Sequence, residues 1–242
     1  MGIAAVIAGA GSGTRLGTQG SKALVRLAGE PLVVHAVRSM IRSGVVDDVI
    51  VVAPGNELHT FERVLDAAGM HARVVAGGST RQASVAASLD AVGDASHVLI
   101  HDAARPLTPV DQIRSVVDAL LSGHPAVVPA LALVDTIKRA GMKGPDGTEP
   151  IEETLDRSVL RAMQTPQGFV FSVIREAHAR FAELARDEAS AAPDDAALVE
   201  ALGVPVVMVP GHDEARKITR PFDLRVAEMT LAEHTTPAEL GL

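Results

Sequence analysis

The chain has 242 residues, which fits one large α/β domain, and it contains no cysteine, which excludes disulfides, thiolate metal sites and cysteine nucleophiles. Its net charge of −8 and its aromatic content of 2% are unfavourable for nucleic-acid binding, which needs a basic face or stacking platforms. Because no apolar run is long enough to span a membrane and the N-terminus lacks the basic region of a signal peptide, we expect a cytoplasmic protein without membrane contact.

Short apolar runs alternate with helical patterns along the chain. Stretches suited to helices follow each of the first four runs, which is typical of a βαβ series. The pattern therefore predicts a mainly parallel sheet. The runs predicted as buried strands are Ile3–Ala8, Val49–Ala53, Ala72–Ala76, His97–His101, Ala126–Ala130 and Val204–Val209.

Prolines mark the beginnings of three predicted helices. Pro31 and Pro221 each open a helix in its first turn, where a missing N–H costs nothing. Thr108 is predicted as a helix cap with Pro109 at the first helical position. The three predicted helices are 31–43, Ile113–Leu121 and Pro221–Glu233.

Two stretches break this alternation. Residues 9–22 hold five glycines, so they predict a loop. Residues 131–157 are rich in glycine, proline and charge, and they are too long for a simple connection. We expect residues 131–157 to form a β-hairpin arm that leaves the body of a single domain spanning 1–242.

The loop Gly9–Gly17 directly follows the first predicted strand. Glycines let the backbone turn its N–H groups toward phosphate oxygens, and Arg15 and Lys22 would add positive charge. A tight turn with two solvated cations is an equally good interpretation of this loop alone. The glycine spacing does not fit a dinucleotide-binding fingerprint. It does not fit a Walker A motif either, because a serine separates Gly20 from Lys22.

A second candidate motif, Gly77–Val85, follows the third predicted strand. The double glycine leaves its backbone groups free to contact a nucleotide base. Arg81, Ser84 and Ser88 share one helical face, although such a stripe is commonly just a hydrated surface.

The third candidate motif, His101–Pro106, lies at the carboxyl end of the fourth strand, where open α/β sheets bind ligands. Asp102 is suited to magnesium or a ribose hydroxyl, and the small Ala103 leaves room for a sugar. Alternatively, Arg105 pairs with Asp102 and only locks the loop. His101 is interpreted as structural.

Several later segments are weak signals by themselves. Asp194 and Asp195 follow a proline, which is typical of a helix N-terminus. The others are Asp135-Thr136, Asp156-Arg157, Thr165-Pro166-Gln167 and Arg216–Thr219.

Taken together and in this order, the motifs resemble the 2-C-methyl-D-erythritol 4-phosphate cytidylyltransferase family, from Ile3 to about Ala227. The resemblance implies a Rossmann-like α/β fold with helices on both faces of the sheet. It also implies a homodimer in which the arm 131–157 hooks around the partner. The expected reaction joins CMP from CTP to the polyol phosphate with Mg²⁺ and releases pyrophosphate.

The resemblance also implies roles for individual residues. Gly11, Gly13, Arg15, Lys22 and Lys217 would hold the triphosphate, the three cations acting at the reacting α-phosphate. Ala10, Gly78, Ser79 and Ser84 would contact cytosine, largely through backbone groups, Asp102 would sit at the ribose and the metal, and Ala103 would contact the nucleotide. Arg105, Thr136, Arg157 and Thr165 would hold the acceptor, Thr136 and Arg157 being donated by the other subunit.

The chain departs from the family pattern at three places. It has Ala8–Gly11 for the usual Pro-Ala-Ala-Gly, Ser21 for the proline before the lysine, and Ser79 near a position that is often acidic. Two alternatives stay open: a cytidylyltransferase for another polyol phosphate such as ribitol 5-phosphate, and a non-catalytic nucleotide-binding homologue. A nicotinamide-dependent reductase is disfavoured by the failed fingerprint.

Overall fold

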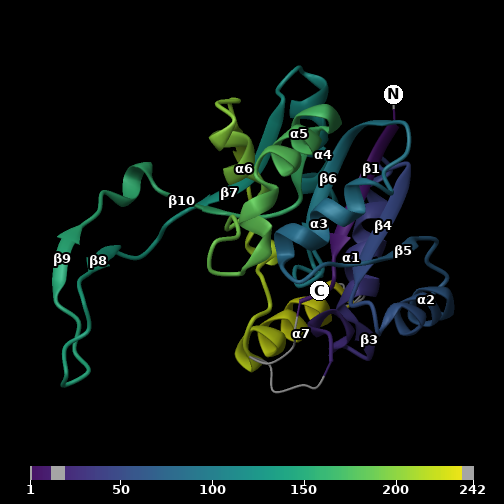
Figure 1. Ribbon diagram of the computed structural model, residues 1–242. Coiled ribbons are helices and arrows are strands. Elements are labelled where there is room, and N and C mark those ends of the chain that lie inside the picture. The colour runs from purple at the N-terminus through teal and green to yellow at the C-terminus, as the bar shows by residue number, and fades with distance from the viewer. Residues whose placement is uncertain (1, 12–19, 236–242) are drawn as a thin grey trace, which may run out of the picture.

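The computed structural model describes residues 2–11 and 20–235. An eight-stranded sheet has the order β10-β7-β11-β6-β1-β4-β5, with β12 paired to β7 (Figure 1). The strands are β1 (Gly2–Ala8), β4 (Asp48–Ala53), β5 (Arg73–Ala76), β6 (Ala95–Asp102), β7 (Ala126–Ala132), β10 (Arg161–Met163), β11 (Gln167–Val170) and β12 (Val207–Pro210). Strands β6, β1, β4 and β5 are mutually parallel, whereas β10 and β11 run antiparallel to their neighbours.

All six predicted strands are present, and the prediction of a mainly parallel sheet is confirmed. The strand predicted at Val204–Val209 begins three residues later, at Val207. Strands β10 and β11 were not predicted. They have only three and four residues and flank Thr165-Pro166, so they lack the long apolar run that identifies a buried strand.

Seven α-helices surround the sheet in the described part of the chain: α1 (Leu32–Ser43), α2 (Leu58–Ala67), α3 (Arg81–Leu89), α4 (Val110–Leu121), α5 (Phe171–Arg180), α6 (Asp195–Ala201) and α7 (Pro221–Thr235). Short 3₁₀ turns are η2 (Lys22–Leu24), η3 (Arg157–Val159), η4 (Ala182–Arg186) and η5 (Asp213–Ala215). Two predicted helix starts were wrong by one residue. Pro31 and Pro109 are extended cap residues rather than first helical residues, and the hydroxyl of Thr108 donates to the carbonyl of Arg105 instead of capping α4.

Alternating side chains of the strands supply two separate cores. On β1, Ile3, Ala5 and Ile7 belong to a cluster with residues of α1, α2 and α4. Ala4 and Val6 belong to a second cluster with residues of α3, α5 and α6. Because successive side chains of a strand point to opposite faces, this division confirms helices on both faces of the sheet.

A third, smaller core attaches α7 to the domain. It is formed by Leu27, Leu32, Ile218 and Ala227. Leu27 belongs to a hairpin of β2 (Arg26–Leu27) and β3 (Glu30–Pro31). Ile218 also donates its backbone N–H to the carbonyl of Ala104 at 2.8 Å, so this core brings the segment before α7 against the end of β6.

The segment 131–157 contains a separate two-stranded antiparallel sheet, β8 (Lys138–Ala140) and β9 (Ile151–Thr154). This hairpin lies to one side of the main sheet in Figure 1, and most of its side chains are exposed. Its use in dimerisation stays a prediction. Across residues 2–11 and 20–235, no helix is both long and apolar enough to cross a membrane.

Candidate functional site

Three loops meet at the carboxyl edge of the parallel strands. Ala8 of β1 lies opposite Asp102 of β6 and Val52 of β4. Gly9 donates its N–H to the carbonyl of Val52 at 2.9 Å, and Gly77 donates to Ala53 at 2.8 Å. The three candidate motifs therefore converge at the edge where open α/β sheets bind ligands.

Ser21 closes the described part of the first glycine loop. Its hydroxyl donates to the carbonyl of Gly9 at 2.6 Å, and its backbone N–H lies 3.2 Å from a carboxylate oxygen of Glu57. The next N–H, that of Lys22, donates to the carbonyl of Gly11 at 3.0 Å. A proline at position 21 has neither donor, so this departure from the family pattern replaces ring rigidity with hydrogen bonds that place Lys22.

The double glycine packs tightly against the first loop and α3. A Cβ on Gly77 would lie 2.8 Å from Ser84 Oγ and 2.9 Å from the Ala10 Cβ, so no larger residue fits there. Gly78 donates its N–H to Ser84 Oγ at 3.1 Å, whereas Ser79 is exposed. Ala10 and Ser84 therefore both pack against Gly77, and Ser84 is bonded to Gly78, while contact of these residues with cytosine stays a prediction.

Asp102 is the electrostatic centre of the site. Its carboxylate lies 2.7 Å from Lys217 Nζ, 3.3 Å from Arg81 Nε and 3.9 Å from Arg105 Nε. Burial by itself raises the pKa of Asp102, but the charges of Arg81, Lys217 and Arg105 outweigh burial and hold that pKa well below its usual range. The carboxylate is therefore ionised, and the three cations leave the cluster with excess positive charge.

Arg105 lies 3.9 Å from Asp102, the pairing that the sequence left open as an alternative, and it is also bonded to the backbone of two other segments. Its Nη1 donates to the carbonyl of Ala215 at 2.7 Å and its Nη2 to that of Met163 at 3.3 Å. These bonds connect the end of β6 to β10 and to the segment before α7. The expected contact of Arg105 with the acceptor stays a prediction.

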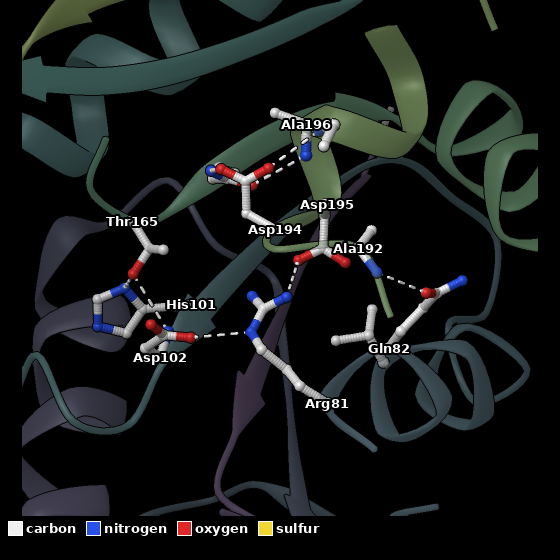
Figure 2. A network of polar contacts seen from close by, with 12 residues as sticks. Arg81, Gln82, His101, Asp102, Thr165, Ala192, Asp194, Asp195 and Ala196 are labelled. Carbon is white, nitrogen blue, oxygen red and sulfur yellow. Dashed lines mark hydrogen bonds and ion pairs between the residues drawn. The ribbon is translucent and has the colours of Figure 1, made fainter. Parts of the chain in front are cut away.

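His101 and Thr165 form a buried hydrogen-bonded pair behind Asp102 (Figure 2). The backbone N–H of Asp102 donates to Thr165 Oγ1 at 3.1 Å, and Thr165 Oγ1 lies 2.9 Å from His101 Nδ1. The other ring nitrogen lies 3.2 Å from the carbonyl of Arg105. A neutral imidazole with its proton on Nε2 satisfies all three contacts, and burial lowers the pKa of His101 to about 4. The burial and the three contacts of His101 support its interpretation as a structural residue.

The sequence did not predict a second buried carboxylate in the site. Asp195 Oδ2 forms an ion pair with Arg81 Nη1 at 2.8 Å, and Asp195 Oδ1 lies 3.0 Å from His178 Nε2. Asp194 alone caps α6, by accepting from Ala197 N–H at 2.9 Å. The Asp194-Asp195 pair correctly indicated a helix N-terminus, but the partners of Asp195 on α3 and α5 are distant in sequence and gave no local signal.

The remaining predicted residues are placed as follows. Ala103 is buried and Gly11 is exposed, while Gly13 and Arg15 lie outside the described residues. Thr136 and Arg157 are exposed on the segment 131–157, and no contact between them and Asp102 is present within the described ranges. Their expected contact with the acceptor therefore needs another chain or a different arrangement of this segment.

The donor set at Asp102 fits a magnesium ion that arrives with a nucleotide. Among residues 2–11 and 20–235, no three His, Asp or Glu side chains are grouped to hold a metal by themselves. Mg²⁺ is commonly bound by one or two carboxylates together with substrate phosphates. One ionised carboxylate beside two glycine loops meets the protein's part of that requirement.

Comparisons with known proteins agree with one another. Residues 3–233 match the family model described as IspD: 2-C-methyl-D-erythritol 4-phosphate cytidylyltransferase. The chain is 48% identical to the protein of that name from Streptomyces coelicolor, over 95% of this chain and 84% of the relative. It is 45% identical to that from Saccharopolyspora erythraea, over 96% of this chain and 100% of the relative.

Solved structures show the same similarity. The crystal structure of 2-C-methyl-D-erythritol 4-phosphate cytidylyltransferase from Thermus thermophilus has a TM-score of 0.73 and 32% identity, over 94% of this chain and 98% of that one. The 4-diphosphocytidyl-2C-methyl-D-erythritol synthase from Anaerococcus prevotii has a TM-score of 0.78 and 25% identity, over 96% of this chain and 98% of that one.

The buried His101 predicts a specific acid sensitivity. Its pKa of about 4 in the folded chain lies below the ordinary value of 6.5, so the unfolded chain takes up this proton first as the pH falls. Acidification from about pH 6.5 to about pH 4 therefore removes stability, at most about 3 kcal/mol from this group. Urea unfolding of wild type and His101→Gln across this range should show a shallower loss in the variant.

The matched control is His124→Gln, since His124 is exposed at the end of α4. This control should keep the wild-type dependence of unfolding free energy on pH. Equal slopes for wild type and His101→Gln would contradict the assignment of a neutral buried imidazole.

Proposed function

The chain belongs to the 2-C-methyl-D-erythritol 4-phosphate cytidylyltransferase family, and we propose that it transfers the cytidylyl group of CTP to 2-C-methyl-D-erythritol 4-phosphate and releases pyrophosphate. The observation that carries the proposal is the cluster of Asp102 with Arg81, Arg105 and Lys217, beside two glycine loops at one sheet edge. The family match and the relatives cover nearly the whole chain, so the proposal concerns the complete reaction.

The reaction needs charge neutralisation and alignment more than proton transfer. An oxygen of the acceptor phosphate attacks the α-phosphorus of CTP in line, and the bond between that phosphorus and the oxygen bridging to the β-phosphate breaks. Pyrophosphate takes the electron pair of the broken bond. Because the attacking phosphate is already ionised, no general base is required, and the buried neutral His101 fits that expectation.

Lys217 and Lys22 are assigned to the triphosphate, together with Arg15 outside the described residues. Lys217 pairs with Asp102 at 2.7 Å, but its side chain is 42% exposed, so it is free to exchange this partner for a phosphate. Arranged cations of this kind stabilise the charge that moves toward the leaving oxygens. Magnesium, held by Asp102 and the phosphates, would add Lewis-acid polarisation when bound.

The nucleoside is assigned to the surface between the two glycine loops. Ala10, Gly78, Ser79 and Ser84 would contact cytosine, largely through backbone groups, and Asp102 would contact the ribose. The close packing of Gly77 against Ala10 and Ser84 supports this assignment, because it leaves backbone rather than side chain at the surface.

The segment 131–157 and the residues just after it are assigned to a homodimer interface. Val134, Met142, Ile151 and Val159 are between 66% and 92% exposed, which is unfavourable in water for large apolar side chains. A second copy of the chain would cover them and bring Thr136 and Arg157 to its partner's acceptor. Two-fold pairing through one shared segment is the commonest form of homo-oligomer. A cytoplasmic location stays a prediction.

The proposed reaction is tested by pyrophosphate release with Mg²⁺, each of the four nucleoside triphosphates being offered with each of two acceptors. Release is expected only with CTP and 2-C-methyl-D-erythritol 4-phosphate. Release with CTP and ribitol 5-phosphate would keep the chemistry and change the acceptor. No release with any pair would leave a nucleotide-binding homologue and refute the proposal.

Lys22→Ala is predicted to lower kcat about 100-fold while changing CTP affinity less than about threefold, because a cation at the α-phosphate acts mainly in the transition state. Steady-state kinetics and calorimetric titration with CTP measure the two quantities. The control Arg63→Ala removes an exposed cation from α2 and should change neither. Unchanged turnover in Lys22→Ala would reject this role.

The shared site is tested by mixing inactive subunits. In each site one subunit would supply Lys22 and its partner would supply Arg157, so the two variants damage different halves of a site. In an equal mixture about half of the exchanging dimers contain one subunit of each variant, and one of the two sites in such a dimer is intact. The mixture should therefore recover about a quarter of wild-type activity. Arg157→Ala mixed with Thr136→Ala should recover none, since both changes damage the same contribution. Equal activity in the two mixtures would contradict a partner-completed site.

A further inference from the structure

Arg81 lies between two buried carboxylates. Its Nε is 3.3 Å from Asp102 Oδ1 and its Nη1 is 2.8 Å from Asp195 Oδ2. Figure 2 shows the Arg81 side chain between these two carboxylates. On the far side of Asp195, the other carboxylate oxygen lies 3.0 Å from His178 Nε2. A continuous polar chain therefore runs from α5 through α6 and α3 to the end of β6.

The side chains around Asp195 are buried, so the members of this hydrogen-bonded series have little room to move. Asp195 is 1% exposed and His178 is 4% exposed. Within the described part of the chain, Arg81 is the one Lys or Arg side chain in an ion pair with Asp195, whereas Asp102 also has Arg105 and Lys217. Burial raises the pKa of Asp195, but the charge of Arg81 and the hydrogen bond from His178 outweigh burial and lower it.

We propose that Asp195, held by His178, is a positioning residue that fixes the guanidinium of Arg81 and thereby sets the orientation and free charge of Asp102 for the nucleotide. This inference rests on the proposed function, in which Asp102 meets the ribose and the metal. Asp195 and His178 touch no reacting group in this account and act only through Arg81.

Two carboxylates share one guanidinium, and that sharing is the physical basis of the effect. When Asp195 is ionised, the guanidinium of Arg81 is bound by both carboxylates. Asp195 then neutralises part of the positive charge of Arg81, so less of that charge acts on Asp102. With a neutral residue at position 195, the whole charge of Arg81 falls on Asp102 and the side chain is free to pivot. Asp102 is then more strongly neutralised and competes less well for the ribose and the cation.

The backbone around the chain is held independently, so a change at Asp195 acts on side chains. Thr80 Oγ1 donates to the carbonyl of Ala185 at 2.8 Å, and Gln82 Nε2 donates to that of Phe181 at 2.9 Å. Gln82 Oε1 also accepts from Ala192 N–H at 3.1 Å. These bonds fasten the start of α3 to residues 181–192 without Asp195.

The test compares Asp195→Asn with Asp194→Asn. The neighbouring Asp194 caps α6, a role that asparagine also fills, and it makes no contact with Arg81 among the described residues. Asp195→Asn should raise the KM for CTP and its dissociation constant about tenfold, while the KM for the acceptor stays unchanged. Asp194→Asn should leave all three constants at wild-type values. Calorimetric titration with CTP and Mg²⁺ gives the dissociation constant without turnover.

A merely structural role would lower the melting temperature without separating the two substrates. The inference is overturned if folded Asp195→Asn binds CTP as wild type does, or if both KM values rise together. If Asp195→Asn does not fold, two variants of His178 provide the test. His178→Leu removes the hydrogen-bond donor to Asp195 and should weaken CTP binding about threefold. His178→Gln keeps a donor and should bind CTP with wild-type affinity. Equal CTP affinity in these two variants overturns the inference.

The outcomes also separate this inference from the proposed function. A wild-type chain that turns over the substrates while Asp195→Asn does so equally well refutes only the positioning role. A wild-type chain that binds CTP but releases no pyrophosphate refutes only the proposed reaction, because the CTP dissociation constants of the variants still report on Asp195. A wild-type chain that does not bind CTP refutes both.

Discussion

A buried carboxylate at a sheet edge must be compensated, and the compensation of Asp102 organises the whole site. Three separate parts of the chain deliver its cations: α3 carries Arg81, the loop after β6 carries Arg105, and the segment before α7 carries Lys217. Removing a partner from a buried charge is far more costly than breaking a surface ion pair. The positions of these three elements are thus tied to a single residue.

The three cations differ in how firmly they are held, and this difference indicates that they have different roles. Arg81 is shared with Asp195, and Arg105 donates to two backbone carbonyls. Lys217 pairs with Asp102 and is the most exposed of the three side chains. The firmly held arginines keep Asp102 in place, whereas Lys217 is suited to leave it for a phosphate with little rearrangement of the backbone.

The features that the sequence predicted correctly each had a local signal in the chain. Apolar runs such as Val49–Ala53 identified the buried strands, glycine loops marked the sheet edge at which the candidate site lies, and the order of motifs indicated the family. Features set by long-range pairing were missed. Strands β10 and β11 are short and exist because β7 and β6 pair with them, and Asp195 looked like a second capping acid because Arg81 is remote in sequence. The predicted cap at Thr108 was wrong because the extended Pro109 occupies the cap position itself.

The most direct test of the central claim is a crystal structure of the chain with CTP and Mg²⁺. We expect Lys217 Nζ to leave Asp102 and contact the α-phosphate, while Arg81 keeps its contacts to Asp102 and Asp195. A bound nucleotide with its triphosphate away from these residues would contradict the role assigned to Lys217 and Asp102. So would an unbroken Lys217–Asp102 pair beside an ordered α-phosphate.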